Sequence, residues 1–286
     1  MSTSGDTNKA APLQLLDQDL AGKNAVVTGS TRGIGRAITL HLAARGASVL
    51  GTCSSPESLR HFDEMNESIR SLYRSSPHSA PKIVGITGNL LSADAPERIA
   101  GAVEREFHGK LHILINNASC LETRPIGQLD ADYVQRLLLG NIQTLILTVD
   151  VLFRNEFFQP NSRIVNISSE STRGHLPNHA FGVYASTKSA MESLTRTWAD
   201  VFGKHPSMPG TTVNSLLVGA TATDAFRQVN GENEAWANYV VSQLSVGTRL
   251  GTPEDVAKVA GLLVSDNAGW ITGSVVAANG GSGKVL

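Results

Sequence analysis

The sequence is poor in cysteine and has almost no net charge. Its two cysteines, Cys53 and Cys120, are too few for a disulfide framework or a structural zinc site, so we expect a reducing compartment, the cytoplasm. The 286 residues carry a formal net charge of −1 and no long run of lysine or arginine. This composition argues against a surface for nucleic acid or for an anionic membrane.

Long apolar runs, repeats and linkers are also lacking. No stretch approaches the ~20 apolar residues that span a bilayer, so we expect no membrane segment. The N-terminal residues are polar and small, without the apolar core of a signal peptide, and we expect a flexible segment over residues 1–19. Nothing divides the remainder, which predicts a single domain over residues 20–286.

What the sequence does contain is an alternation of short β-branched runs and amphipathic stretches. Such alternation predicts an α/β fold, a Rossmann-like doubly wound parallel sheet of about seven strands with helices on both faces. Ile113-Leu114-Ile115 is apolar throughout, as expected for a strand covered on both sides. The expected strands are Asn24–Thr28, Ser48–Thr52, Lys82–Thr87, His112–Asn116, Arg163–Ser168, Thr212–Val218 and Ser274–Ala278.

A glycine-rich turn lies between the first expected strand and the first expected helix. Val26–Gly29 ends the strand, and Gly33-Ile34-Gly35 opens the helix. Glycine lets the backbone approach a phosphate closely or adopt positive φ. The N-terminus of the helix offers free N–H groups and the positive end of its dipole. The turn therefore predicts a dinucleotide phosphate site, although a glycine string alone would also fit an ordinary tight turn.

Tyr184 and Lys188 form a Tyr-x-x-x-Lys pair. Four residues apart on a helix, the two side chains share one face. A free tyrosine has a pKa near ~10, too high for a base at neutral pH, and we expect the Lys188 ammonium to lower it. The pair therefore predicts a group that moves a proton, although this spacing also occurs on solvated helices.

Further blocks follow these two motifs in a fixed order. Together, the motifs resemble the short-chain dehydrogenase/reductase family in its single-domain form, from about Leu20 to about Gly281. The family usually has Asn-Asn-Ala-Gly where this chain has Asn116-Asn117-Ala118-Ser119. The remaining blocks are Asn141, Ser169, Val213-Asn214, Gly219–Thr223, Arg249–Val256 and Ile271-Thr272-Gly273.

The resemblance implies a catalytic set of Ser169, Tyr184, Lys188 and Asn141. Ser169 would hydrogen-bond the substrate oxygen and polarise it, and Tyr184 would exchange the proton with that oxygen. Lys188 would also bond the nicotinamide ribose, and Asn141 would hold a water that links Lys188 to solvent.

One departure from the family concerns the serine. The family's serine usually lies thirteen residues before the tyrosine, the position of Ser171, whereas Ser169 lies fifteen before Tyr184. We choose Ser169 because the preceding strand reads into it as in relatives and because Leu176-Pro177 keeps its usual offset from it. Two extra residues then fall within Asn178–Val183, where they form either an adapted substrate pocket or a neutral surface insertion.

The end of the second strand indicates which cofactor binds. An NAD site usually has Asp or Glu there, but no carboxylate occurs between Gly51 and Glu57. Arg32 lies inside the glycine turn, where NADP members of the family often carry a basic residue, and a guanidinium suits a 2′-phosphate. We therefore predict NADP(H), with the alternative that Arg32 is a solvated surface residue.

The predicted cofactor contacts come from the strand ends. Asn89 stands where relatives commonly have Asp, and Val218 stands where they have Pro. The full set is Gly29, Ser30, Arg32, Gly33, Ile34, Gly35, Thr52, Ser54, Ser55, Asn89, Leu90, Asn117, Ala118, Tyr184, Lys188, Val218, Gly219, Thr221 and Thr223.

These residues predict an NADPH-dependent oxidoreductase that reversibly reduces a ketone or aldehyde to an alcohol. Its partner would be a small-molecule substrate, in a setting such as specialised-metabolite biosynthesis. A non-catalytic NADP-binding sensor and a redox-neutral enzyme that retains its cofactor stay open as alternatives. The resemblance also implies a homodimer or homotetramer, paired through the apolar helix Asn141–Phe157 and the helix of Tyr184.

Overall fold

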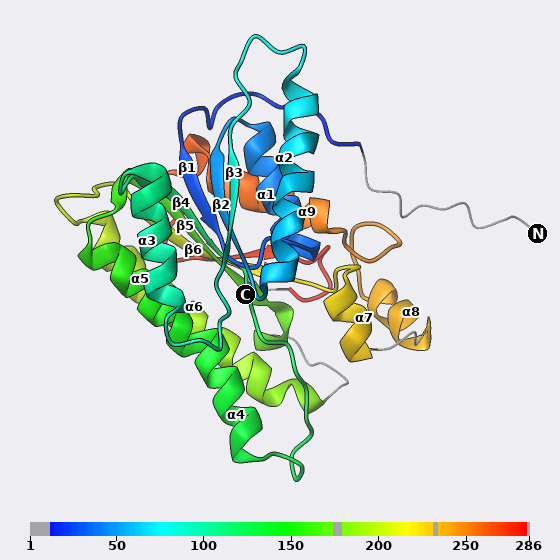
Figure 1. Cartoon of the computed structure of the whole chain (residues 1–286). Helices are drawn as coiled ribbons and strands as arrows, with labels where there is room; N and C mark the ends of the chain where they lie inside the picture. The colour runs from blue at the N-terminus through cyan, green and yellow to red at the C-terminus, as the bar shows by residue number, and fades with distance from the viewer. Residues whose placement is uncertain (1–11, 174–178, 231–233, 285–286) are drawn as a thin grey trace, which may run out of the picture.

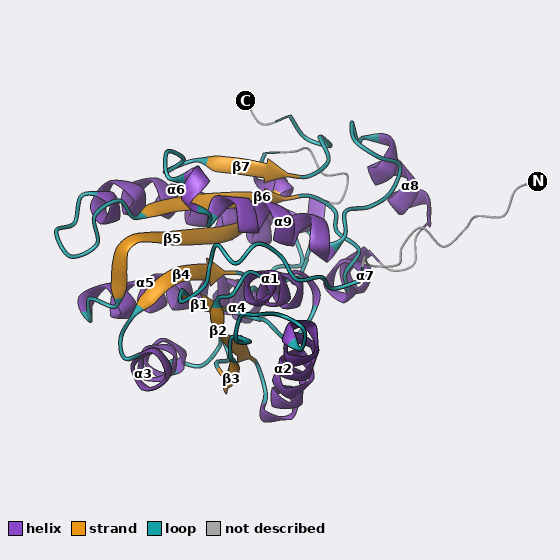
Figure 2. Cartoon of the chain, turned by 90° about the horizontal axis from the view of Figure 1, so that it is seen from above, coloured by secondary structure: helices purple, strands orange, loops and turns teal. Residues whose placement is uncertain are grey.

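The short β-branched runs of the sequence form one sheet, and the amphipathic stretches between them form helices on both of its faces (Figures 1 and 2). This computed structural model describes residues 12–173, 179–230 and 234–284. The sheet has seven parallel strands in the order β3-β2-β1-β4-β5-β6-β7, which confirms the predicted fold class. The strands are β1 Asn24–Val27, β2 Ser48–Cys53, β3 Ile83–Thr87, β4 Leu111–Asn116, β5 Phe158–Ser169, β6 Thr212–Val218 and β7 Val275–Ala278.

The helices form two layers, because alternate residues of each central strand point to opposite faces. Ala25 and Val27 pack with α1, α2 and α9, whereas Val26 packs with α3, α5 and α6. The larger helices are α1 Gly33–Ala44, α2 Arg60–Tyr73, α3 Ala95–Phe107, α4 Ala131–Leu138, α5 Thr144–Arg154, α6 Gly182–Gly203, α7 Asp224–Asn230, α8 Glu234–Ser242 and α9 Pro253–Leu263. Short helical turns are η1 Pro56–Leu59, η2 Leu139–Gln143, η3 Glu170–Thr172, η4 His179–Phe181 and η5 Asp266–Ala268.

Two elements differ from the sequence prediction by more than one residue. Strand β5 begins at Phe158, five residues before the predicted Arg163, because Phe158 pairs with Leu111 across a register shift that accommodates Pro160 and Asn161. The helix predicted over Asn141–Phe157 instead starts at Ala131 and ends at Arg154. Its end is earlier because the carbonyl of Phe157 already accepts from the N–H of Leu111 in β4, while the N–H of Phe157 donates back to Leu152 in the last turns of α5.

This continuous helix, Ala131–Arg154, is long and apolar enough to cross a membrane by length and composition, with a mean hydropathy of 1.5 over 18 residues. The expectation that no stretch approaches such a length is therefore wrong. Half of that window is buried inside the protein, and Leu145, Val149 and Leu152 belong to the core beneath the sheet. A core helix of this kind is weak evidence for a membrane segment.

Residues near the end of the predicted flexible segment contact the sheet domain. The backbone N–H of Leu16 donates to Ala44, and the side chain of Gln18 donates to the same carbonyl. Asp19 forms an ion pair with Arg45. The chain is therefore held against the end of α1 from about Leu16 onward.

Candidate active site

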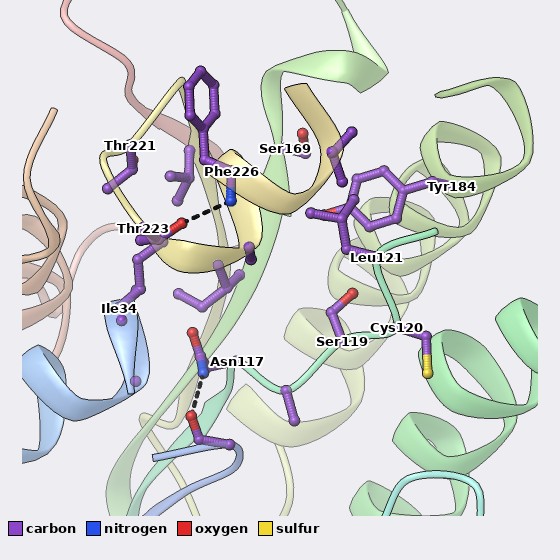
Figure 3. A pocket seen from close by; sticks show the side chains of 18 of the residues that line it. Ile34, Asn117, Ser119, Cys120, Leu121, Ser169, Tyr184, Thr221, Thr223 and Phe226 are labelled. Carbon is purple, nitrogen blue, oxygen red and sulfur yellow. Dashed lines mark hydrogen bonds between the residues drawn. The ribbon is translucent and has the colours of Figure 1, made fainter. Parts of the chain in front are cut away.

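A cavity of about 520 Å³ opens at the carboxyl ends of the parallel strands. The strand order reverses between β1 and β4, and crevices at such a switch point are where ligands bind in open α/β sheets. Figure 3 shows the cavity with Thr221, Thr223 and Phe226 on one side and Leu121 and Tyr184 on the other.

The glycine turn forms one end of this cavity. Gly29 and Gly33 have φ of 65° and 53°, which favours glycine. A Cβ atom on Gly35 would lie 2.2 Å from the carbonyl oxygen of Gly29 and 2.5 Å from Nδ2 of Asn117. The N-cap residue of α1, Arg32, makes no side-chain cap hydrogen bond, and the first turn of α1 has no acidic residue. The turn is therefore closely packed where it faces Gly29 and Asn117. The N–H groups at the start of α1 are left available to bind an anion.

Several residues predicted to touch the cofactor also brace this turn. Nδ2 of Asn117 donates to the carbonyls of Thr28 and Gly29 at 2.9 and 3.0 Å, and the hydroxyl of Thr52 accepts from the N–H of Gly29 at 3.0 Å. Two of the predicted cofactor contacts, Ser30 and Ser55, are not among the described residues that line the cavity. Ser30 is fully buried behind the turn, so its predicted role as a contact would be indirect. All other predicted cofactor contacts line the cavity.

Tyr184 and Lys188 lie at the other end of the cavity, on the first two turns of α6. Both are buried. The ammonium of Lys188 donates to the carbonyl of Ile167 at 2.8 Å and lies 5.7 Å from the centre of the Tyr184 ring. Strand β5, which carries that carbonyl, ends at Ser169 beside Tyr184.

The electrostatics of this pair differ from the sequence prediction. Burial raises the pKa of Tyr184 to about 12, against the hydrogen bonds of Ser119 and Ser169, which favour the phenolate. Burial also lowers the pKa of Lys188 to about 8. The expectation that Lys188 lowers the tyrosine pKa is therefore wrong for this structure, because desolvation of the phenolate outweighs other influences.

Apolar side chains line the cavity both beside Tyr184 and across from it. Charged side chains among the described lining residues are Arg32 at the glycine turn, Lys188, Glu170 and Asp224. The apolar lining here comprises Leu121, Phe181, Phe226, Val229, Tyr239 and Val240. In the described part of the chain, no group of three or more His, Cys, Asp or Glu side chains could hold a metal ion.

Comparison with known proteins places this cavity in a family. A family model described as enoyl-(acyl carrier protein) reductase matches residues 29–282. The short-chain dehydrogenase/reductase FrzI from a Cladobotryum species is 33% identical over 273 residues, which cover 94% of this chain and 97% of FrzI. The chain belongs to the short-chain dehydrogenase/reductase family.

Two other members of the family are also similar to this chain. The L-rhamnose 1-dehydrogenase (NADP(+)) of Thermoplasma acidophilum is 34% identical, over 92% of this chain and 97% of that enzyme. A short-chain dehydrogenase from Burkholderia cenocepacia J2315, solved in complex with NADP, superposes with a TM-score of 0.79 at 27% identity. That match covers 92% of this chain and 99% of the solved one.

Asn141 lies behind the cavity wall of this dehydrogenase/reductase, within the π-helical turn η2. Its Oδ1 accepts from the N–H of Cys120 at 2.7 Å and from Ser119 at 3.1 Å. Its Nδ2 donates to the carbonyl of Cys120 at 3.0 Å and to Thr187 at 3.1 Å. Asn141 therefore joins the loop after β4 to α6, one residue before Lys188, and π turns are common at functional sites.

The structure distinguishes between the two candidate serines, Ser169 and Ser171. Ser169 lines the cavity, and its hydroxyl accepts hydrogen bonds from the N–H and the hydroxyl of Ser171 at 3.2 and 3.0 Å. Ser171 is not among the described lining residues. The geometry favours Ser169, while Leu176-Pro177, on which the sequence argument relied, lies outside the described residues.

Sequence reasoning missed three polar residues around this centre. Ser119, where the family usually has glycine, hydrogen-bonds Asn141 and contributes to the environment of Tyr184. Glu192 is buried and accepts from Ser168, Thr172 and Arg173 at 2.7 to 3.3 Å. Its position four residues after Lys188, on the same helix face, was the available signal. Glu170, the third, had no signal beyond its place after Ser169.

Proposed function

We propose that this protein is an NADP(H)-dependent oxidoreductase that reduces a ketone or aldehyde to an alcohol and can run in reverse. The observation that carries the proposal is the position of a protonated phenol, Tyr184, in the same cavity as an anion-binding glycine turn. The turn suits a dinucleotide, because the cradle behind Gly35 has no room for a side chain and the N-terminus of α1 has open donors.

The proposed cofactor is supported by charge at the turn. Arg32 and Ser54 both line the cavity, and the lining residues from the end of β2, Thr52–Ser54, include no carboxylate. The related rhamnose dehydrogenase and the Burkholderia enzyme are named with NADP. A guanidinium binds a phosphate with several charge-assisted hydrogen bonds, so we expect NADPH to bind more tightly than NADH.

Bound NADPH would supply the hydride, and the protein would supply orientation and a proton. With a pKa of about 12, Tyr184 holds its proton at neutral pH and can donate it to the oxygen of the reduced carbonyl. Ser169 would hydrogen-bond that oxygen as negative charge develops on it. The ammonium of Lys188 would stabilise the resulting phenolate. The backbone carbonyl of Asn141 would hold the water through which the proton is replaced, since the side-chain amide of Asn141 is fully hydrogen-bonded.

We further propose that the substrate is uncharged and largely apolar. Apart from the glycine turn, the described lining includes aliphatic and aromatic residues, the polar residues Gln243 and Ser282, two carboxylate residues and no cation other than Lys188. A substrate carboxylate or phosphate would therefore lose its hydration without gaining a partner. Such a substrate is compatible with specialised-metabolite biosynthesis.

The test is NADPH oxidation with ketones and aldehydes offered as matched pairs, each an ester and its free carboxylic acid. We expect turnover of the esters, weaker turnover with NADH, and loss of turnover in Tyr184→Phe with NADPH binding retained. NADPH binding without reduction of any carbonyl would favour the sensor. Conversion of a substrate without net NADPH consumption would favour the redox-neutral enzyme.

We also propose a homodimer or homotetramer in the cytoplasm. The helix Ala131–Arg154 leaves Leu138, Ile146 and Leu147 exposed at 47%, 37% and 43%. A cluster of exposed apolar side chains on a helix marks an interaction surface. Light scattering of the purified chain, beside Leu147→Lys, would measure the assembly and show whether this face forms it.

A further inference from the structure

Glu170 follows Ser169 directly, and its carboxyl group takes no part in the proton transfer proposed above. Its side chain lines the cavity. Burial raises the pKa of Glu170, whereas hydrogen bonds from Ser282, Asn279 and the backbone of Ala220 oppose that rise. Burying a carboxyl group is costly unless its oxygens are hydrogen-bonded, so these contacts account for its place in the cavity wall.

The partners of Glu170 lie mainly in the turn after β7, residues Asn279–Lys284, here called the C-terminal turn. The hydroxyl of Ser282 contacts both Oε2 of Glu170 and, at 3.0 Å, the carbonyl of Asn279. A hydroxyl has one proton to donate. Ser282 therefore shares its single proton between Oε2 of Glu170 and the carbonyl of Asn279.

The close approach of three strand ends depends on Gly219. A Cβ atom on Gly219 would lie 2.7 Å from Cβ of Asn279 and 3.2 Å from Oε2 of Glu170. The backbone of Gly219 also bonds to Ala278 at 3.3 Å. The ends of β5, β6 and β7 therefore meet at the carboxyl group of Glu170.

The C-terminal turn in turn holds the segment that follows α8, Leu244–Val246. The N–H groups of Ser245 and Val246 donate to the carbonyl of Gly280 at 2.8 and 3.0 Å. The ammonium of Lys284 donates to the hydroxyl of Ser245 at 2.6 Å. Helix α8 itself contributes Tyr239 and Val240 to the apolar wall of the cavity.

We propose that Glu170 is a positioning residue that joins the end of β5 to the C-terminal turn and thereby holds α8 against the substrate end of the cavity. Because α8 supplies part of the apolar wall, loss of this link weakens substrate binding more than it slows the chemical step or weakens NADPH binding. The inference rests on the proposed carbonyl reduction for its kinetic effect, but the link itself is a property of the protein without substrate.

The experiment compares Glu170→Ala, Glu170→Gln and Ser282→Ala in the full chain. Glutamine keeps the shape of glutamate and can both donate to and accept from Ser282, so it should behave as the wild type. For alanine at either position we expect faster hydrogen exchange over residues 237–248, and a KM for the carbonyl substrate raised by roughly tenfold. The Kd for NADPH should change less than the KM, because the link lies beside one predicted cofactor contact, Gly219, and leaves the contacts at the glycine turn in place.

Two further variants sharpen the design. The double variant Glu170→Ala/Ser282→Ala should be no worse than either single change, because the two residues act through one contact. Glu64→Ala removes an exposed carboxylate on α2 and should change neither exchange nor KM. If Glu170→Ala does not fold, Ser282→Ala and Glu170→Gln still decide the question.

Unchanged exchange over residues 237–248 in both alanine variants, or a glutamine variant as impaired as alanine, would overturn the proposal. A wild-type protein that reduces no carbonyl would instead count against the proposed function. Exchange is measured without turnover, so the two failures are distinguishable.

Discussion

On the β1–β3 side of the sheet the cavity is bounded by a glycine turn, whereas on the β4–β6 side its polar groups include two buried side chains. The first side has Gly29, Gly33 and Gly35 around open helix donors, with Arg32 exposed to solvent. The second has Tyr184 and Lys188, both with pKa values displaced by burial. Anion binding needs close approach of N–H groups, while the pKa values of groups that transfer protons respond to burial, nearby charges and hydrogen bonds.

The largest expected effect tests the second side. Replacing Ser169 with alanine removes the hydroxyl proposed to stabilise charge on the substrate oxygen, and we expect kcat to fall by about 10²–10³. Ser171→Ala removes only a neighbour that donates to Ser169 and should cost less than tenfold. Steady-state kinetics of both variants with NADPH would decide between them, and the reverse order would assign the role to Ser171.

A second prediction concerns the cost of burying Lys188. The lowering of its pKa from 10.5 to about 8 corresponds to about 3 kcal/mol of free energy of unfolding lost when the ammonium is buried. Lys188→Met should therefore be more stable than the wild type at pH 7. The gain is reduced by the free energy of the lost hydrogen bond to Ile167, and the variant should lose activity.

The difference in stability between Lys188→Met and the wild type should decrease as the pH rises. Between pH 8 and 10 the unfolded wild type binds more protons at Lys188 than the folded protein does, so its stability rises with pH in this window. The advantage of Lys188→Met should shrink accordingly. Chemical denaturation at pH 7, 8, 9 and 10 would measure the gap, and a gap that is constant or grows would contradict the buried-charge account.

On the first side, glycine geometry should matter more than side-chain chemistry. In Gly35→Ala the new Cβ would meet the carbonyl of Gly29 at 2.2 Å, which we expect to cost about 1–3 kcal/mol of stability and to weaken NADPH binding. Gly101→Ala is a matched control, because Gly101 also lies in a helix and a Cβ atom added there would have nothing within 4 Å. That variant should gain about 0.5–1 kcal/mol, as thermal unfolding would show.

The smallest expected effect is on cofactor choice. Arg32→Ala should lower the preference for NADPH over NADH by about tenfold or somewhat more, because it removes charge-assisted hydrogen bonds to the 2′-phosphate. Arg36→Ala, on the same helix but not among the described lining residues, should leave the preference unchanged. Equal preference in the wild type and Arg32→Ala would identify Arg32 as a solvated surface residue.

Much of the fold could be predicted because it depends on local pattern. Each of the seven strands was located from β-branched runs, and the spacing of Tyr184 and Lys188 placed both on one face of a helix. The start of β5 was missed because Pro160 and Asn161 interrupt its pattern, and only pairing with β4 carries Phe158 into the sheet.

The sequence predicted which residues form the candidate site, but it did not predict the directions in which their pKa values shift. The direction of the Tyr184 pKa depends on how many atoms surround the phenol, which is a property of tertiary packing. Glu170 and Ser282 are 112 residues apart, and no local pattern links them. Likewise, Asn117 and Thr52 were recognised as neighbours of the cofactor, but their bracing of the glycine turn depends on contacts between strands.

The strand order also governs how the chain is assembled during synthesis. Strand β1 pairs with β4, and the contact from Asn24 to His112 spans 88 residues. Until β4 leaves the ribosome, β1 can pair only with β2, and its other edge stays open. Nascent chains that end before Leu111 therefore present an unpaired apolar strand, the kind of edge that aggregates, and closure of the sheet is a late, long-range step that slows folding.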